Sequence, residues 1–196
     1  GTVLIISNLD PKFVTPDILF VLFGVYGDVQ RVKILFGKPD TALVQLSTEH
    51  QSKVALENLN GCPLFGKEIM VNQSHHNTIS MPREADGEAS KLTKDYTGSN
   101  LHRYRQAGSK NYQHICPPST MLHVSNISQT ASEPQLREIF STYGTIKNFK
   151  FFSKDKRMAL IEMGSLDEAV LSLVHLHDYR LGETNLRVSF SKNKIK

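Results

Sequence analysis

Residues 4–9 have the sequence Leu-Ile-Ile-Ser-Asn-Leu, and residues 122–127 repeat it as Leu-His-Val-Ser-Asn-Ile. A second pair of blocks recurs in the same order: residues 41–46, Thr-Ala-Leu-Val-Gln-Leu, return as Met-Ala-Leu-Ile-Glu-Met in residues 158–163. The displacement along the chain is nearly the same for both pairs. Such recurrence indicates that one structural unit is duplicated within the chain.

The residues around these blocks predict the same elements in each copy. Apolar alternation predicts a first strand, and Thr15-Pro16 and Ser132-Glu133-Pro134 are typical helix starts. Each first helix is expected to stop at a Tyr-Gly pair, Tyr26-Gly27 or Tyr143-Gly144. The remaining strands are expected at 29–36, 42–46, 69–73, 146–152, 159–163 and 186–191, and the second helices at 49–59 and 166–176. The order β-α-β-β-α-β predicts sandwiches with helices on one sheet face only.

Length and composition limit the class of protein. The 196 residues, 39% of them hydrophobic, suit two small domains and a linker, and a net charge of +4 is a weak indicator of a polyanionic partner. Cys62 and Cys116 lie in no C-x-x-C pair, which predicts a reduced intracellular protein without a structural zinc. The chain has no apolar run of about 18 residues and no signal-like start, so neither a membrane span nor secretion is expected.

Metal and catalytic sites are not expected either. His75 and His76 are adjacent on a predicted strand and therefore point to opposite faces, with no acidic or Cys partner at zinc spacing. Gly24 and Gly27 end a helix rather than open one, so they do not form a phosphate-binding loop. We therefore expect a protein that is not an enzyme and needs no cofactor.

The repeated blocks resemble the short and long ribonucleoprotein signatures of RNA-recognition motifs. Residues 22–36 and 186–192, together with linker residues 92–96 and 101–103, resemble the third and fourth RNA-recognition motifs of the polypyrimidine tract-binding protein family. The resemblance implies an α+β fold of two tandem ferredoxin-like sandwiches, packed through their helical sides. The expected domains are residues 1–84, with an extra edge strand near 78–82, and residues 119–196, joined by a partly ordered linker at 85–118.

The positions at which such motifs stack bases on aromatic rings are mostly filled by other residue types. They hold Ile5, Thr41 and Leu43 in the first copy, and His123, Met158 and Leu160 in the second. Strand alternation nevertheless places Lys33 and the strand-end Phe36 away from the first core, and Lys150 and Phe152 opposite the core pair Phe149 and Phe151. His123 supplies a flat ring, and polar residues end each fourth strand. Interleaved charge and aromatic rings indicate RNA binding.

The candidate RNA-binding residues combine this pattern with the positions that the resemblance carries over. In the first domain they are Ile5, Lys33, Phe36, Leu43, Asn72, Ser74, His75, His76 and Arg83. In the second domain they are His123, Ser125, Lys150, Phe152, Lys154, Met158, Leu160, Ser191 and Lys192. Where the family has Lys before His after the fourth strand, this chain has His75, which removes a fixed charge.

The resemblance implies binding of single-stranded, CU-rich RNA and regulation of pre-mRNA splicing and mRNA processing. It also implies a nuclear protein that shuttles to the cytoplasm, acts as a monomer, and has splicing co-regulator proteins as further partners. A different class of function stays open on the residues alone: a protein-interaction module of the same fold with little RNA binding.

Apolar residues that the separate domains do not need predict a contact between them. In the first helix of copy one and the second helix of copy two these residues are Ile18, Val21, Val25, Val170, Leu171 and Val174. The linker also carries Leu92, Tyr96, Leu101, Tyr104, Tyr112 and Ile115, which are unusual in a free linker. Two sheets that face away from each other would loop a bound RNA between them. A partly ordered linker between independently tumbling domains is the alternative.

Overall fold

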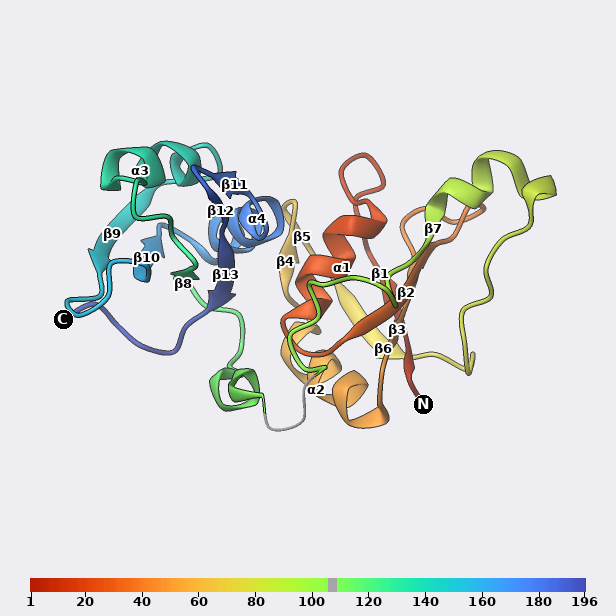
Figure 1. The fold of residues 1–196 in the computed structure, drawn as a ribbon. Coiled ribbons are helices and arrows are strands. Elements are labelled where there is room, and N and C mark those ends of the chain that lie inside the picture. The colour runs from red at the N-terminus through yellow and green to blue at the C-terminus, as the bar shows by residue number, and fades with distance from the viewer. Residues whose placement is uncertain (106–108) are drawn as a thin grey trace. The chain divides into compact units, whose positions relative to one another are not determined.

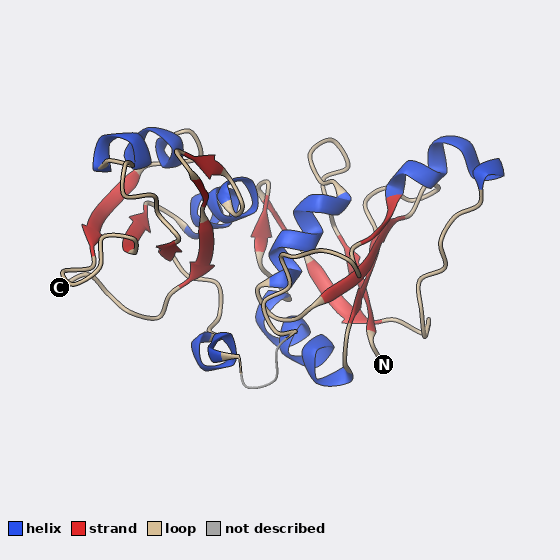
Figure 2. Cartoon of the chain, in the orientation of Figure 1, coloured by secondary structure: helices blue, strands red, loops and turns tan. Residues whose placement is uncertain are grey.

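The computed structural model describes residues 1–105 and 109–196, which form two compact units, Gly1–Ile115 and Cys116–Lys196. Figure 1 traces the chain through both units, and Figure 2 shows that each combines helices with an antiparallel sheet. The repeated β-α-β-β-α-β order is present in both. The α+β fold class is therefore confirmed. How the units pack against each other stays a prediction.

The first unit contains a five-stranded sheet with the strand order β6-β1-β3-β2-β7. Its elements are β1 (Val3–Ser7), α1 (Pro16–Gly24), β2 (Val29–Ile34), β3 (Ala42–Leu46), α2 (Glu49–Leu59), β4 (Pro63–Leu64), β5 (Lys67–Glu68), β6 (Met70–Gln73), η1 (Glu84–Leu92), β7 (Thr93–Asp95) and η2 (Lys110–His114). Both α1 and α2 pack on one face of this sheet. The face turned away from the helices is called the open face below.

The second unit has a four-stranded sheet with the order β13-β8-β10-β9, which is the order of the first sheet without its fifth strand. Its elements are β8 (Met121–Ser125), α3 (Glu133–Ser141), β9 (Ile146–Phe151), β10 (Ala159–Met163), α4 (Leu166–Leu176), β11 (Arg180–Leu181), β12 (Thr184–Asn185) and β13 (Arg187–Phe190). The expected strands and helices are present, and Phe36 and Phe152 lie just beyond the ends of β2 and β9.

The helices begin where the sequence predicts, because polar side chains bind their free amides. The Thr15 hydroxyl accepts a hydrogen bond from the Ile18 amide at 3.3 Å, and the Ser132 hydroxyl accepts one from the Gln135 amide at 3.3 Å. A proline lies in the first turn of both α1 and α3. Below them the helix-facing strand residues Leu4 and Leu122, among others, are fully buried.

The glycine of each Tyr-Gly pair has a packing role rather than the expected role of a helix stop. Gly27 is not among the glycines with positive φ, so its backbone conformation does not require glycine. A Cβ at Gly27 would lie only 2.7 Å from Cβ of Gln51, whose Oε1 accepts the Asp28 amide at 2.8 Å. In the second unit a Cβ at Gly144 would lie 2.5 Å from Cβ of Glu168. Glycine therefore lets the second helix approach the turn.

Replacing Gly27 with Ala should lower the free energy of unfolding by about 1–3 kcal/mol, because the new methyl group would overpack this junction. Gly24→Ala is the matched control: no heavy atom lies within 4 Å of a Cβ at Gly24, in the last turn of α1. This control should change stability by less than about 1 kcal/mol. Urea unfolding of both variants measures the difference, and equal midpoints would contradict the packing role.

The linker expected at 85–118, of which 106–108 lie outside the described residues, belongs largely to the first unit. Strand β7 pairs antiparallel with β2, with Lys94 opposite Val32. Next to it the Tyr96 ring stacks on Phe20, with centroids 4.1 Å apart and planes inclined by 7°. The Tyr96 hydroxyl donates a hydrogen bond to Asp17 at 2.7 Å. The first domain thus extends well past residue 84.

The ionisation of Asp17 and Tyr96 reflects this contact. Burial alone would raise the pKa of the Asp17 carboxyl, but hydrogen bonds from Lys94 and Tyr96 outweigh it and hold the pKa below its ordinary value. Burial and the hydrogen bond to Asp17 raise the pKa of the Tyr96 hydroxyl. Tyr96 therefore stays a donor and Asp17 an acceptor at neutral pH.

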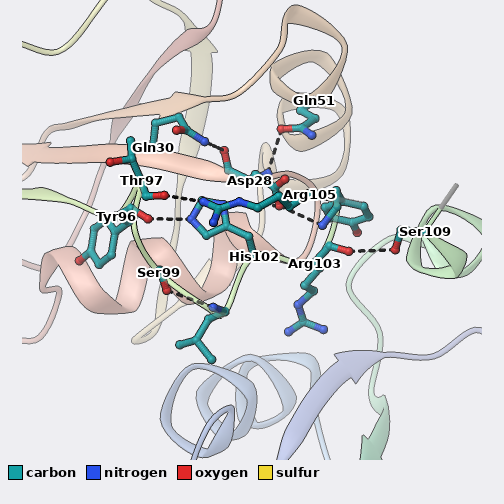
Figure 3. A network of polar contacts seen from close by, with 12 residues as sticks. Asp28, Gln30, Gln51, Tyr96, Thr97, Ser99, His102, Arg103, Arg105 and Ser109 are labelled. Carbon is teal, nitrogen blue, oxygen red and sulfur yellow. Dashed lines mark hydrogen bonds and ion pairs between the residues drawn. The ribbon is translucent and has the colours of Figure 1, made fainter. Parts of the chain in front are cut away.

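A buried polar network holds the next part of the linker against the first unit (Figure 3). The Tyr104 amide donates to Oδ1 of the buried Asp28 at 3.0 Å, and the Tyr104 hydroxyl donates to the Val25 carbonyl. His102 Nε2 lies 2.7 Å from the Tyr96 carbonyl, so that nitrogen carries a proton, while its Nδ1 lies 3.7 Å from Asp28 Oδ1. These contacts fix residues 96–104 on the unit.

The extra edge strand near 78–82 was a wrong prediction, since none of these residues, all of them described, forms a strand. The additional strand is β7, Thr93–Asp95, on the β2 side of the sheet. The backbone of Ile79 cannot join a ladder because side chains bind it: its carbonyl accepts from Arg31 at 2.6 Å, and its amide donates to Gln45 at 3.0 Å.

The residues predicted to pack between domains differ in exposure. Ile18, Val21 and Leu171 are half-buried, whereas Val25, Val170 and Val174 are buried. The backbone carbonyl of Val25 accepts a hydrogen bond from the Tyr104 hydroxyl of the same unit. The role of this set in domain packing stays a prediction. Among the described residues, no helix has the length and apolar character that crossing a membrane requires.

Candidate functional site

Strand register gathers the predicted residues of the second unit on its open face. His123 of β8 lies opposite Leu160 of β10 and Ser189 of β13, and Leu160 lies opposite Lys150 of β9. Residues directly opposite in an antiparallel sheet share a face, so these four point away from α3 and α4. Strand alternation had predicted the same face.

Phe152 and His123 form the aromatic part of this face. Their ring centroids are 5.5 Å apart and their planes nearly perpendicular, at 85°. The Phe152 amide donates to the Met158 carbonyl at 3.0 Å, which ties the residue to the sheet although it follows β9. Phe149 and Phe151 pack against each other with ring centroids 5.1 Å apart. Alternation turns these two rings to the helix side.

The cations of the second open face lie around these rings. Lys150, Lys154 and Lys192 are exposed, while Met158, Leu160 and Ser125 are partly exposed. Asp155 does not neutralise Lys154, because Arg157 holds its carboxylate at 3.0 Å. Hydrogen bonds from the Arg157 side chain and backbone lower the pKa of Asp155. The face therefore offers flat rings, an apolar centre and positive charge at its rim.

Ser191 was predicted as a polar contact for RNA at the end of the fourth strand, but its side chain is not accessible from the open face. It is buried, with 8% of the residue exposed, and its hydroxyl accepts the Asn193 amide at 3.0 Å. Its carbonyl accepts the Ser119 hydroxyl at 2.7 Å. On β13 the serine of the open face is Ser189, which the register places opposite His123.

The first unit presents Ile5, Lys33 and Asn72 in the corresponding arrangement. Ile5 lies opposite Asn72 of β6 and Leu43 of β3, and Leu43 lies opposite Lys33 of β2. Leu43 was expected at the surface of this face, yet only 6% of it is exposed. Ile79 covers it, in a cluster with Val3, Leu43, Ile5 and Leu35.

Residues 78–79 thus cover one end of the first open face. Besides the two bonds to Ile79, the Thr78 hydroxyl donates to Gln45 Oε1 at 3.3 Å. Arg31, which reaches the Ile79 carbonyl, is also paired with Asp95 of β7 at 3.0 Å. The sequence signal for this cover is a lone isoleucine in a polar stretch after β6, and sequence reasoning missed it.

A groove of about 880 Å³ lies beside the uncovered end of the first sheet. We call it the Phe36 groove; its lining residues include Lys33, Phe36, Lys38, Met81, Arg83 and Asp86. It brings together three of the predicted residues, and Phe36 is 65% exposed there. Lys38 and Met81 were not predicted, because a tertiary approach of the β2–β3 turn and the segment before η1 brings them here.

The polar end of β6 is partly tied to the protein. The Ser74 amide donates to the Val3 carbonyl at 3.0 Å, and the Ser74 hydroxyl accepts the His76 amide at 3.1 Å. His75 and His76 are exposed beyond the strand, and Asn72 is exposed on the open face. Within the described part of the chain, no three His, Cys, Asp or Glu side chains gather in a way that could hold a metal ion.

Comparison with known proteins gives one family. Residues 1–99 and 106–195 match the model of the RNA recognition motif, also called the RRM, RBD or RNP domain. Among curated proteins, the chain is 35% identical over 189 residues to polypyrimidine tract-binding protein homolog 3 of Arabidopsis thaliana. The match covers 96% of the chain and 42% of that relative, so the chain spans less than half of its length.

Three solved structures are similar to the chain or to one of its repeats. RNA recognition domains 1 and 2 of Sex-lethal from Drosophila melanogaster are 20% identical, with a TM-score of 0.35, over 97% of this chain and 100% of that one. The first two RRM domains of yeast poly(U) binding protein are 18% identical, with a TM-score of 0.35, over 98% and 99%. The RNA15 RRM is 27% identical, with a TM-score of 0.35, over 39% and 93%.

Proposed function

Because the chain belongs to the RNA recognition motif family, we propose that it binds single-stranded, pyrimidine-rich RNA through the open faces of both sheets. The observation that carries the proposal is the grouping of Phe152, His123 and Lys150 on one face of the second sheet. Single-stranded RNA is held by stacked bases, by contacts to base edges and by cations at phosphates, and this face has groups of each kind.

In the second unit Phe152 is the stacking surface for one base. His123 meets its ring edge-on and holds it in place, and the apolar Leu160 supports a neighbouring base. Lys150 and Lys154 bind phosphates. Ser125 and Ser189, which flank His123 on the open face, bind the Watson–Crick edges of splayed bases, where uracil and cytosine differ from purines.

The first unit binds a shorter stretch. Ile5 and Asn72 contact one base on the uncovered part of the sheet, and the Phe36 groove takes the next nucleotide. Lys33 and Arg83 in this groove bind its phosphate, and the Phe36 ring stacks on the base. His75 stands where the family has a lysine, so this strand end lacks one fixed positive charge for a phosphate.

The cellular role we propose is regulation of pre-mRNA splicing and mRNA processing in the nucleus, with shuttling to the cytoplasm. The similarity to a polypyrimidine tract-binding protein homologue supports this role. Two sheets that face away from each other would bring separated pyrimidine tracts of one transcript together by looping the RNA between them.

The test is a titration of the chain with a short CU-rich oligonucleotide and a purine-rich one of equal length, followed by fluorescence anisotropy at several salt concentrations. We expect the CU-rich strand to bind at least about tenfold more tightly, because base-edge contacts discriminate. With four cations at phosphates, the slope of log K against log salt should be roughly −3.

Two outcomes would contradict the proposal, each in its own way. Equal affinity for both oligonucleotides would leave RNA binding and remove pyrimidine specificity. If neither oligonucleotide binds to protein that circular dichroism shows to be folded, the chain is a protein-interaction module of the RRM fold instead.

A further inference from the structure

The two sheets differ at one edge. In the first unit β7 covers the outer side of β2, whereas in the second unit no strand among the described residues pairs with the outer side of β9. The apolar side chains reflect this difference. Val32 and Ile34 of β2 are buried, but their counterparts in the repeat, Phe149 and Phe151, are only half-buried.

The backbone of β9 has groups free to pair on that outer side. The Phe152 amide donates to the Met158 carbonyl, so the backbone groups of Phe152 point toward β10. Every second residue of a strand points its backbone groups the same way, so those of Lys150 and Asn148, opposite Leu160 and Glu162, also point toward β10. In an antiparallel ladder the intervening residues turn their amides and carbonyls the other way. Lys147, Phe149 and Phe151 therefore present donors and acceptors at the edge.

In the first unit, the corresponding edge of β2 pairs with the added strand β7. The amide of Tyr96 donates to the Gln30 carbonyl at 2.7 Å, and Lys94 pairs with Val32. The inserted strand also contributes side chains, because Asp95 pairs with Arg31 and the Tyr96 ring stacks on Phe20 of α1. An acidic residue followed by an aromatic one secures the strand at this edge.

The second unit offers matching groups at the same repeat positions. Lys147 and Phe149 stand where the first unit has Gln30 and Val32, and Arg137 stands where it has Phe20. The Arg137 guanidinium lies over the Phe149 ring, 5.3 Å from its centroid. Its other face is planar and cationic, and an aromatic ring can stack on it.

The positive charge at the outer edge of β9 favours a binding partner with acidic side chains. Lys147 is exposed at this edge, and the Arg137 guanidinium is paired with Glu133 at 2.9 Å. An extended segment with acidic side chains meets opposite charge here. A second copy of β9 would bring like charges together across the new pair, which disfavours edge-to-edge self-association.

We propose that the outer edge of β9 binds an extended segment of a partner protein, as an added antiparallel strand with acidic side chains and an aromatic ring stacked on Arg137. This protein-binding edge is separate from the RNA-binding open face, so it goes beyond the proposed function. RNA and such a partner could be bound at the same time.

The probe is a synthetic peptide with the sequence of residues 90–99 carrying Lys91→Glu and Lys94→Glu, so that it keeps Asp95 and Tyr96 in an acidic context. It is titrated into the uniformly ¹⁵N-labelled chain of 196 residues and followed by NMR. We expect amide shifts centred on Lys147, Phe149 and Phe151, with unchanged sedimentation as a monomer. The same shifts should appear when the CU-rich oligonucleotide is saturating.

Three variants separate a backbone pairing from simple charge attraction. A peptide N-methylated at the Tyr96 position cannot donate to the Lys147 carbonyl and should bind about fivefold more weakly. Lys147→Glu in the protein should weaken binding by a similar factor. Arg180→Glu, an equal charge change at an exposed site in β11, should leave binding unchanged.

The proposal is overturned by any of three results. These are absence of binding to the folded chain, displacement of the peptide by the oligonucleotide with shifts on the open face, and equal affinity of the N-methylated peptide. Formation of a dimer by the chain alone, with the same edge amides shifted, would assign the edge to a second copy instead.

Discussion

Replacing Phe152 with Ala should weaken binding of a CU-rich oligonucleotide to the second unit by about 1–3 kcal/mol, or about 5- to 150-fold. Phe152 supplies a partly exposed ring at the second open face, and the centroids of the Phe152 and His123 rings lie 5.5 Å apart. Because Phe152 lies beyond the end of β9, its loss removes the stacking surface without opening the core between sheet and helices.

The control for this substitution is Tyr179→Ala. Tyr179 is an aromatic residue of the same unit, 41% exposed in the turn before β11, and it has no place on the open face. Its removal should leave the dissociation constant unchanged. If Phe152→Ala stays folded and binds RNA as the unchanged protein does, the assignment of the second open face to RNA is wrong.

Replacing Tyr96 with Ala should lower the free energy of unfolding of the first unit by about 3–5 kcal/mol, as for other large buried aromatic residues. Tyr96 is 7% exposed, stacks on Phe20 and donates to Asp17. Tyr96→Phe keeps the stacking and removes only the hydroxyl, so we expect a loss of about 1 kcal/mol. Urea unfolding measures both values.

The two Tyr96 variants also test how the linker is held. If Tyr96→Ala unfolds at the same urea concentration as the unchanged protein, residues 93–105 are not docked, and the linker is the partly ordered tether considered as the alternative. Faster amide hydrogen exchange in Tyr96→Ala, confined to residues 93–105, would support docking.

Local periodicity explains what the sequence could predict. Alternation along 146–152 placed Lys150 and Phe152 on one face and Phe149 and Phe151 on the other, because side-chain direction in a strand depends only on position. Helix starts at Thr15 and Ser132 were equally local. The repeat then made each assignment in one copy support the same assignment in the other.

Contacts between distant segments explain what was missed. Strand β7 depends on Tyr96 reaching Phe20 and Asp17, and the cover on the first sheet depends on Ile79 reaching Arg31 and Gln45. Neither contact leaves a periodic signal. The packing role of Gly27 was missed for the same reason, since the opposing atoms come from α2.

Errors within the candidate site have the same origin. Ser191 looks like a polar strand end in the sequence, but Asn193 and Ser119 bind it from neighbouring segments. In the Phe36 groove, Lys38 and Met81 come from two loops whose approach no pattern predicts. The face to which a strand residue points could therefore be predicted from sequence, whereas the contacts that loops make with distant segments could not.

If both open faces bind RNA as proposed, Ile79 leaves the first unit with a smaller free sheet surface than the second. Residues 78–79 cover part of the first open face, so the first unit has fewer positions at which a base can be contacted. The central strands of the second open face are uncovered. A single base change in the tract held by the second half would then cost more binding energy than the same change in the other tract. Under the proposed function, target sequences would be strictly constrained in the tract bound by the second unit and tolerant in the tract bound by the first.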